Sequence, residues 1–221
     1  MNCERESWIL SLDEIAAILS LVGRERFVGL AEMQAQPLQT QDILNACCRL
    51  LQDRMMTQVD GKYRLSRALS EGVEPVCMAK TVLVLIPGRM RWERVLFYVG
   101  RGVTVLERSI RGLALTRLDR EALAEELWER VELHPEDEPP DEIPLPPAAS
   151  ALREELMVDA SFLMEAMDPD TGSRRGWIRV RRQALQDNWL EWTQDGRVCQ
   201  TFLSRRTLAD ALSSILRGDI E

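Results

Sequence analysis

The sequence predicts an α+β protein whose antiparallel sheet, or sheets, are built from two similar units of three strands followed by a helix. The stretch Lys80–Arg108 contains three short apolar runs separated by tight turns. The stretch Trp177–Ser204 repeats this pattern, and each array leads into an amphipathic helix. Turns this short join antiparallel neighbours, because a parallel connection needs a crossover of a dozen or more residues.

The first 70 residues predict two helices and a hairpin. Ser11-Leu12-Asp13-Glu14 forms a capping box that begins a helix, and Gly23 is a suitable residue to end it. Apolar residues at helical spacing predict a second helix from about Thr40 to Met55. Asp60-Gly61 then lies between two short extended runs, which is a strong hairpin pattern.

This order of elements is that of a winged helix. The phrase LLQDRMMTQVDGKYRLS is similar to the end of the third helix and the wing of bacterial winged-helix regulators. The resemblance covers about residues 11–66, and we take residues 8–66 as a winged-helix-like segment. It implies, as the alternative function, a DNA-binding transcriptional regulator whose C-terminal part senses a ligand or dimerises.

The first strand array begins with a continuous apolar run, Thr81–Ile86, which predicts a strand covered on both faces. Turns at Pro87-Gly88 and at Gly100–Gly102 separate it from two further strands. The helix that follows is capped by Thr116 or Asp119 and should bury one apolar stripe. That stripe consists of Leu123, Leu127 and Val131.

Residues 134–149 predict a linker between two halves. Residues 134–150 contain six prolines, five acidic residues and no lysine or arginine, which argues against helix and central strand. We therefore divide the chain into an N-terminal half (1–133, with the meander and helix at 80–133), the linker (134–149) and a C-terminal half (150–221).

In the C-terminal half we expect a helix over 150–167, three strands and a closing helix. The strands are expected at Trp177–Arg182, Trp189–Thr193 and Val198–Leu203. Asp195-Gly196 suits the last hairpin turn. Ser204 should cap the closing helix, whose inner face would carry Leu208, Leu212, Ile215 and Leu216.

Composition favours a cytoplasmic protein. The chain has 221 residues, 45% hydrophobic and 29% charged, with a net charge of −8 that resides mostly in the linker. The five cysteines are odd in number and include no CxxC pair, as expected of reduced thiols in a cytosol. No apolar run is long enough to span a membrane, and the first residues do not read as a signal peptide.

The residues needed for catalysis are missing from the pattern, so we expect no enzyme. His134, the only histidine, lies at the start of the linker, and the scattered cysteines have no zinc-site spacing. Neither GxxxxGK[ST] nor GxGxxG occurs. We therefore expect no catalytic residue, no cofactor and no metal.

Two features point to protein binding. Arg179 and Arg181 share one face of a predicted strand and could pair with an acidic partner. The simpler alternative, which we favour, is that they pair with carboxylates of the chain itself. Trp189 and Trp192 should lie on opposite faces of the next strand, and tryptophan is over-represented at interfaces.

The DNA-binding alternative uses the winged-helix-like segment. It would place Gln41, Asn45 and Arg49 in a major groove, with Lys62 and Arg64 on phosphates. Residues 1–70 carry 8 basic and 9 acidic groups, so the electrostatic term that drives non-specific DNA binding would be weak. Charge therefore disfavours nucleic acid as the partner.

The layout as a whole resembles the EspG-type chaperones of type VII (ESX) secretion. The segments that carry the resemblance are SLDEIAAILSLVG, FYVGRGVTVLER and LTRLDREALAEELWERV. The resemblance implies an α+β fold with two similar halves around a central antiparallel sheet. It also implies a cytosolic adaptor or chaperone that binds a helical or acidic segment of another protein, with a dimer left open.

Overall fold

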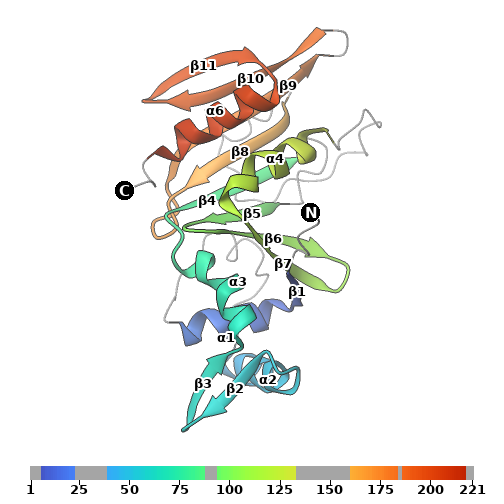
Figure 1. The fold of residues 1–221 in the computed structure, drawn as a ribbon, viewed down its shortest axis with the longest axis vertical. Helices are drawn as coiled ribbons and strands as arrows, with labels where there is room; N and C mark the ends of the chain where they lie inside the picture. Colours follow the sequence, from blue (N-terminus) through green and yellow to red (C-terminus); the bar gives the residue numbers. More distant parts are fainter. Residues whose placement is uncertain (1–5, 23–38, 88–93, 133–159, 184–185, 218–221) are drawn as a thin grey trace.

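Nine strands form one antiparallel sheet in the computed structural model, which describes residues 6–22, 39–87, 94–132, 160–183 and 186–217. In chain order the strands are β1 (Ser7–Leu10), β4 (Thr81–Pro87), β5 (Val95–Val99), β6 (Val103–Ser109), β7 (Gly112–Leu118), β8 (Ala160–Met167), β9 (Arg174–Gln183), β10 (Gln186–Gln194) and β11 (Arg197–Phe202). Their order across the sheet is β1-β7-β6-β5-β4-β8-β9-β10-β11 (Figure 1). A second sheet contains only β2 (Met56–Val59) and β3 (Lys62–Leu65).

Apart from the edge strand β1, the strand order is symmetrical about the central pair, β4 and β8. Strands β4 to β7 run outward from the centre in one direction, and β8 to β11 run outward in the other. Each meander leads into a helix, α4 (Leu123–Glu132) after the short 3₁₀ turn η1 (Arg120–Ala122), and α6 (Arg205–Ile215). The α+β class and the antiparallel sheet are thus confirmed, and the two arrays belong to a single sheet.

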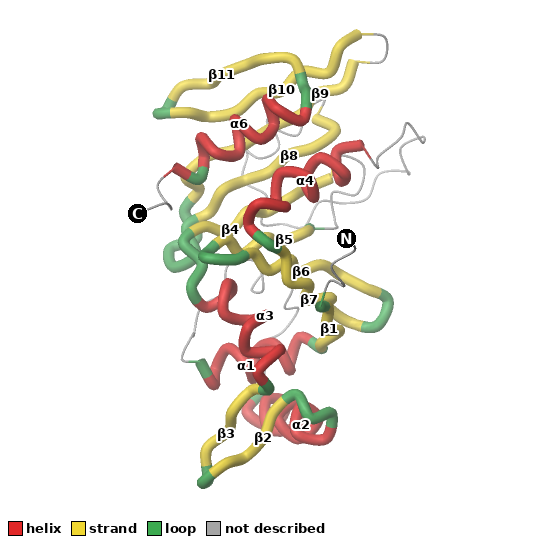
Figure 2. Tube along the Cα trace, viewed as in Figure 1, coloured by secondary structure: helices red, strands yellow, loops and turns green. Residues whose placement is uncertain are grey.

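Helices cover the sheet on both faces (Figure 2). One face packs against α3 (Arg67–Cys77), and apolar side chains of α1 (Leu12–Leu21) and α3 join those of β4 to β7 in one core. The helix α2 (Thr40–Gln52) packs against α1 and β2 and adds Ala46 and Leu50 to this core. The opposite face forms a second core with α4 and α6. None of the described helices is both long and apolar enough to span a membrane.

Strand β4 is buried on both faces, which explains its unbroken apolar sequence. Val82, Val84 and Ile86 enter the core of α1 to α3, whereas Leu83 and Leu85 enter the core of α4 and α6. A strand in this position has no solvent-facing side, so it lacks the alternation of polar and apolar residues seen at surfaces.

Two expectations about the strand units are wrong. Ala160–Met167 was expected to end a helix but forms β8, and the rest of that predicted helix lies outside the described residues. The stretch Ser109–Arg117 lies outside the three strands expected within Lys80–Arg108, but it forms the end of β6, a turn and most of β7. Each unit therefore has four strands rather than three.

The physical reason is that tertiary context overrides local preference. The β8 sequence ASFLMEAM is rich in good helix formers, yet it fills the sheet centre between β4 and β9. Its Phe162, Met164 and Ala166 face one core and Leu163 faces the other. The sequence signal for β7 is also weak, because the two-residue turn before it is Ile110-Arg111 rather than a pair typical of hairpins.

Other local expectations are confirmed. Ser11 and Glu14 form both hydrogen bonds of the predicted capping box, and Ser204 caps α6. Asp60-Gly61 and Asp195-Gly196 form the turns of the β2–β3 and β10–β11 hairpins, with positive φ at all four residues. The linker at 134–149 lies outside the described residues, so the division into domains remains a prediction.

Gly112 is required where β7 meets β1. Its φ is +149°, and a Cβ there would lie 2.7 Å from the backbone carbonyl oxygen of Leu10. Gly112→Ala should therefore lower the free energy of unfolding by about 1–3 kcal/mol. Gly102→Ala is the control, because its Cβ would lie 3.5 Å from Pro75 and its φ is not positive. Urea unfolding followed by circular dichroism measures both, and equal losses would contradict this account.

Hydrogen bonds and an ion pair connect the β8–β9 turn to the start of β4. Asp168 accepts hydrogen bonds from the backbone amides of Thr171, at 2.8 Å, and Asp170, and it pairs with Arg175. Arg175 also donates to the carbonyl oxygen of Lys80, at 3.0 Å, beside the start of β4. The Thr171 amide and then the Arg175 guanidinium hold the pKa of Asp168 well below its usual range.

A carboxyl group whose pKa is lower in the folded state than in the unfolded state stabilises the fold at pH values above its unfolded-state pKa. This stabilisation is lost as the pH falls towards the folded-state pKa. Asp168→Asn should therefore be less stable than the wild type at pH 7, and the difference should shrink as the pH falls below about 4. Thermal unfolding of both proteins between pH 7 and pH 3 tests this. A difference that stays constant with pH would show that the charge of Asp168 does not act in this way.

Candidate functional site

Three of the four residues predicted for protein binding lie on one face of the C-terminal half of the sheet. Strands β9 and β10 turn Ile178, Val180 and Leu190 toward α6 and its core. The alternate residues therefore face the other way, and we call their surface the C-terminal sheet face. It comprises Trp177, Arg179 and Arg181 of β9, Trp189, Glu191 and Thr193 of β10, and Val198, Gln200 and Phe202 of β11.

Strand register aligns these residues in rows. Arg181 lies opposite Trp189, which lies opposite Phe202. The ring centroids of Trp189 and Phe202 are 4.5 Å apart. In the next row, Arg179 lies opposite Glu191, which lies opposite Gln200. Arginine thus lines one side of the face, and apolar and amide side chains line the side toward the sheet edge.

Glu191 is the charged centre of the face. It is 6% exposed, and both predicted arginines reach it. Arg179 donates from Nε to Oε2 at 2.7 Å and pairs through its terminal nitrogen as well, and Arg181 lies at 3.5 Å. The guanidinium of Arg179 also lies over the Trp177 ring, 5.6 Å from its centroid. These contacts hold Arg179 in a fixed geometry.

The structure thus brings together three of the four predicted residues. Arg179, Arg181 and Trp189 share the face, whereas Trp192 points to the opposite side and packs against the core of α6. The two arginines do meet a carboxylate of the chain itself, as the simpler alternative held.

Sequence reasoning missed Glu191, Phe202, Val198 and Gln200. A pattern that could have found them is present: Asp195-Gly196 sets the register of the hairpin, which places Phe202 opposite Trp189 and Gln200 opposite Glu191. Phe202 and Val198 are 53% and 63% exposed. The face therefore combines arginine side chains held by Glu191 with accessible apolar groups, a composition that suits protein recognition.

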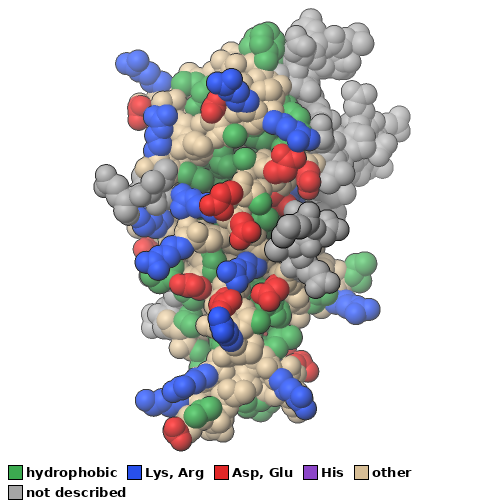
Figure 3. Space-filling model, viewed as in Figure 1, with side chains coloured by type: hydrophobic (Ala, Val, Ile, Leu, Met, Phe, Trp, Pro, Cys, Tyr) green, Lys and Arg blue, Asp and Glu red, His purple; other side chains and the backbone are tan. Residues whose placement is uncertain are grey.

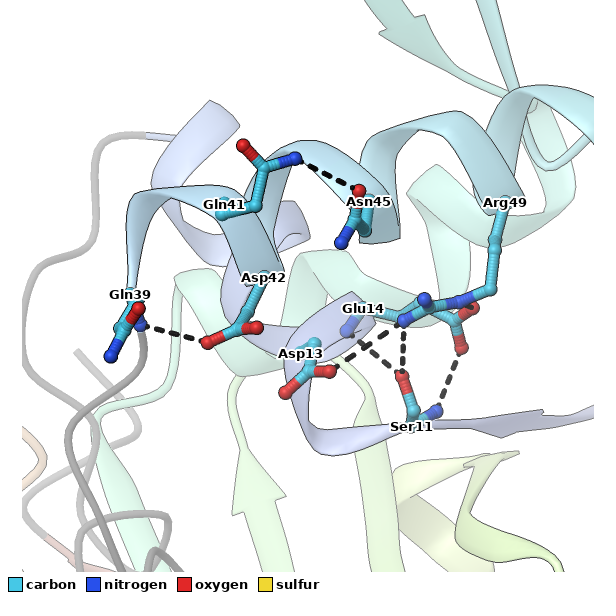
Figure 4. A network of polar contacts seen from close by, with 8 residues as sticks. All are labelled: Ser11, Asp13, Glu14, Gln39, Gln41, Asp42, Asn45 and Arg49. Carbon is cyan, nitrogen blue, oxygen red and sulfur yellow. Dashed lines mark hydrogen bonds and ion pairs between the residues drawn. The ribbon is translucent and has the colours of Figure 1, made fainter.

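The candidate DNA-binding residues lie at the far end of the molecule, in α2 and the β2–β3 hairpin (Figure 1). Figure 4 shows that Arg49 points back toward the start of α1. Its Nε donates to Glu14 at 3.0 Å, and its terminal nitrogen lies 3.3 Å from the Ser11 hydroxyl and 3.6 Å from Asp13. Arg49 thus joins α2 to the capped end of α1.

The remaining candidates are exposed. Gln41 donates to Asn45 at 3.1 Å along the outer face of α2, and Lys62 and Arg64 lie on β3. The exposed residues between Gln41 and Gln52 are Gln41, Leu44, Asn45, Cys48 and Gln52, all of them uncharged. Leu44, an apolar residue of this outer face, is 54% exposed. Nucleic-acid binding by this segment stays a prediction that its electrostatics do not favour.

No group of three or more His, Cys, Asp and Glu side chains among the described residues could hold a metal ion. On the side of the molecule shown in Figure 3, acidic and basic side chains are interspersed, without a continuous basic patch.

Breaking the central ion pair should destabilise the fold. Glu191→Gln would leave Arg179, whose side chain is 16% exposed, without its carboxylate. We expect a loss of about 2 kcal/mol in unfolding free energy, below that of a fully buried pair because Arg179 keeps some contact with water. Glu129→Gln on the exposed side of α4 is the control. Chemical denaturation that gives equal values for both variants would contradict this role of Glu191.

Comparison with known proteins shows similarity at the level of fold. No family model matches the sequence, and no curated protein matches it. A solved structure with a similar fold is the type VII secretion system chaperone EspG5 of Mycobacterium tuberculosis, in complex with a PE25–PPE41 dimer. The TM-score is 0.57 at 9% sequence identity, over 96% of each chain. The chain is thus similar to this chaperone in fold along nearly its whole length.

Proposed function

We propose that this chain is a protein-binding chaperone or adaptor associated with a type VII-like secretion system in the cytoplasm. The observation that carries the proposal is the similarity of fold to a secretion chaperone over 96% of both chains. That chaperone was solved in complex with a protein dimer, so the analogous client of this chain would also be a protein. The proposal contains no catalytic step, no cofactor and no metal.

We place the client on the C-terminal sheet face, for reasons of chemistry. Trp189, Phe202 and Val198 offer accessible apolar surface beside Arg179 and Arg181. Trp and Arg are the residue types most enriched among those that dominate binding energy. Because Glu191 already orients both arginines, they would lose little side-chain entropy on binding.

A helical segment with a mixed surface suits this face best. An amphipathic helix could lay its apolar stripe against Trp189 and Phe202 while its acidic residues reach Arg181. The side chain of Arg181 is 34% exposed, so it is partly accessible to a carboxylate of the client. The client would thus be a protein that presents a helix with neighbouring apolar and acidic residues.

Photo-crosslinking in the native host tests where the client binds. A benzoylphenylalanine at position 189 should capture a specific protein, because Trp189 lies in the middle of the proposed site. The same group at position 63, where exposed Tyr63 lies on β3 at the other end of the molecule, is the control. Capture from position 63 alone would move the site to the winged-helix-like segment, and capture from neither would refute the proposal.

Affinity for the captured client should depend on charge at the face. Arg181→Glu should weaken binding about tenfold or more, because it replaces an attraction to acidic residues by repulsion. Arg206→Glu is the matched control, because Arg206 is an exposed residue of α6, on the other side of the sheet. Calorimetric titration measures both variants, and equal affinities would show that the charge of Arg181 is not used.

A further inference from the structure

Strand β11 is one edge of the nine-stranded sheet as described, and its outer side is available for pairing (Figure 1). An edge strand presents a row of N–H and C=O groups that can pair with another strand. The other edge, β1, is four residues long, whereas β11 has six. The longer edge therefore offers more backbone groups to a partner.

The register of the hairpin shows which backbone groups point outward. Gln194 and Arg197 flank the two-residue turn, where Asp195 and Gly196 have φ of 51° and 73°, as in a type I′ turn. The flanking pair of such a hairpin exchanges both hydrogen bonds, and bonded pairs then alternate with non-bonded pairs. Val198, Gln200 and Phe202 consequently direct their N–H and C=O groups away from β10.

An independent contact supports this direction. The carbonyl oxygen of Phe202 accepts a hydrogen bond from the Thr207 hydroxyl at 2.8 Å, as a group pointing away from β10 could. A carbonyl oxygen has two lone pairs, so it can accept a second bond from a new strand.

The edge also lacks the features that usually prevent strand pairing. Natural edge strands are commonly blocked by proline, by lysine or other charges, or by a bulge. Between Val198 and Phe202 the sequence VCQTF contains no charged residue and no proline, and the β10–β11 register is regular. Val198 and Phe202 are exposed apolar residues on this edge. A strand with this composition is suited to pairing.

We propose that a second copy of this chain pairs with β11 across a two-fold axis through Gln200. A two-fold axis makes the two strands antiparallel, as in the rest of the sheet. It sets Gln200 opposite Gln200 of the second copy, and Val198 opposite Phe202 of the second copy. These three positions are the ones whose backbone groups point outward, so both chains would form hydrogen-bonded pairs in the same register.

Side chains fit this self-pairing. Val198 and Phe202 share a face, so each axis-related pair joins an aliphatic to an aromatic side chain, which is a favourable cross-strand combination. Arg197 would lie opposite Leu203 of the second copy, so no like charges meet along the strand. The client face of each copy would then continue into that of the other.

The pairing gives about six hydrogen bonds, two for each bonded pair. One strand pair alone buries less surface than the 1,200–2,000 Å² or so typical of stable complexes. We therefore expect a reversible dimer whose population rises with protein concentration.

Sedimentation equilibrium on the whole chain tests the proposal. The wild type should show a monomer–dimer equilibrium. Gln200→Lys and Gln200→Glu should each be monomeric, because like charges would face each other at the axis. An equimolar mixture of the two variants should recover the dimer. Gln58→Lys, at an exposed position of β2, adds the same charge elsewhere and should dimerise as the wild type does.

Cysteine crosslinking tests the register. Gln200→Cys should form a disulfide-linked dimer in mild oxidant, because paired Cα atoms in such a position lie about 5.5 Å apart. Val198→Cys should not, because the register sets it against Phe202 of the second copy. The wild type, treated in the same way, is the control for crosslinks that the native cysteines form.

Each outcome decides the proposal. A wild type that stays monomeric, a dimer that survives Gln200→Lys, or a mixture of the two charged variants that stays monomeric would overturn it. Equal crosslinking from positions 198 and 200 would also overturn it. Client binding by Arg181→Glu is measured separately, so failure of the dimer and failure of the chaperone function remain distinguishable.

Discussion

The pairing of β4 with β8 is the interaction on which the rest of the structure depends. Six residues of each strand lie in register there, from Val82 opposite Met167 to Pro87 opposite Phe162. It is the only strand pair that joins the N-terminal unit to the C-terminal unit in the described sheet. Side chains of β4 and β8 enter both cores, so burial of apolar surface on both faces stabilises this one junction.

Charged groups near this junction are paired rather than excluded. Glu165 of β8 is 2% exposed and bonds to Arg174 at 3.1 Å, and Asp168 holds Arg175 against the start of β4. Further out, Glu191 and Arg179 repeat the arrangement. Burying a carboxylate without a counter-charge would destabilise the fold. The arginines of β9 therefore stabilise the sheet, whether or not they also bind another protein.

Local sequence patterns predicted those elements whose structure is determined locally. The capping box at Ser11, the cap at Ser204, the Asp-Gly turns and the apolar run of β4 each have a local physical cause. Strands β7 and β8 escaped prediction because nothing local requires them. The helix-forming residues of β8 become a strand only because two strands flank it, and the Ile110-Arg111 turn has no typical hairpin residue.

The candidate site was predictable in part for the same reason. Alternation along β9 and β10 places Arg179, Arg181 and Trp189 correctly, but the role of Glu191 depends on burial, which alternation alone does not reveal. Arg49 shows the reverse case. Its position on a recognition-like helix suggests contact with a ligand, yet the fold gives it Glu14 and Ser11 as partners. The sequence shows which charged side chains are available, and the fold determines which partner each of them binds.

We propose that the client protein binds to the C-terminal half of the sheet and not to the winged-helix-like end. Hydrogen–deuterium exchange of the chain alone and bound to its client tests this most directly. The account predicts slower exchange in β10 and β11, over Gln186–Phe202, with α2 and the β2–β3 hairpin unchanged. Protection that appears in Thr40–Leu65 while β10 and β11 exchange as in the free protein would contradict it.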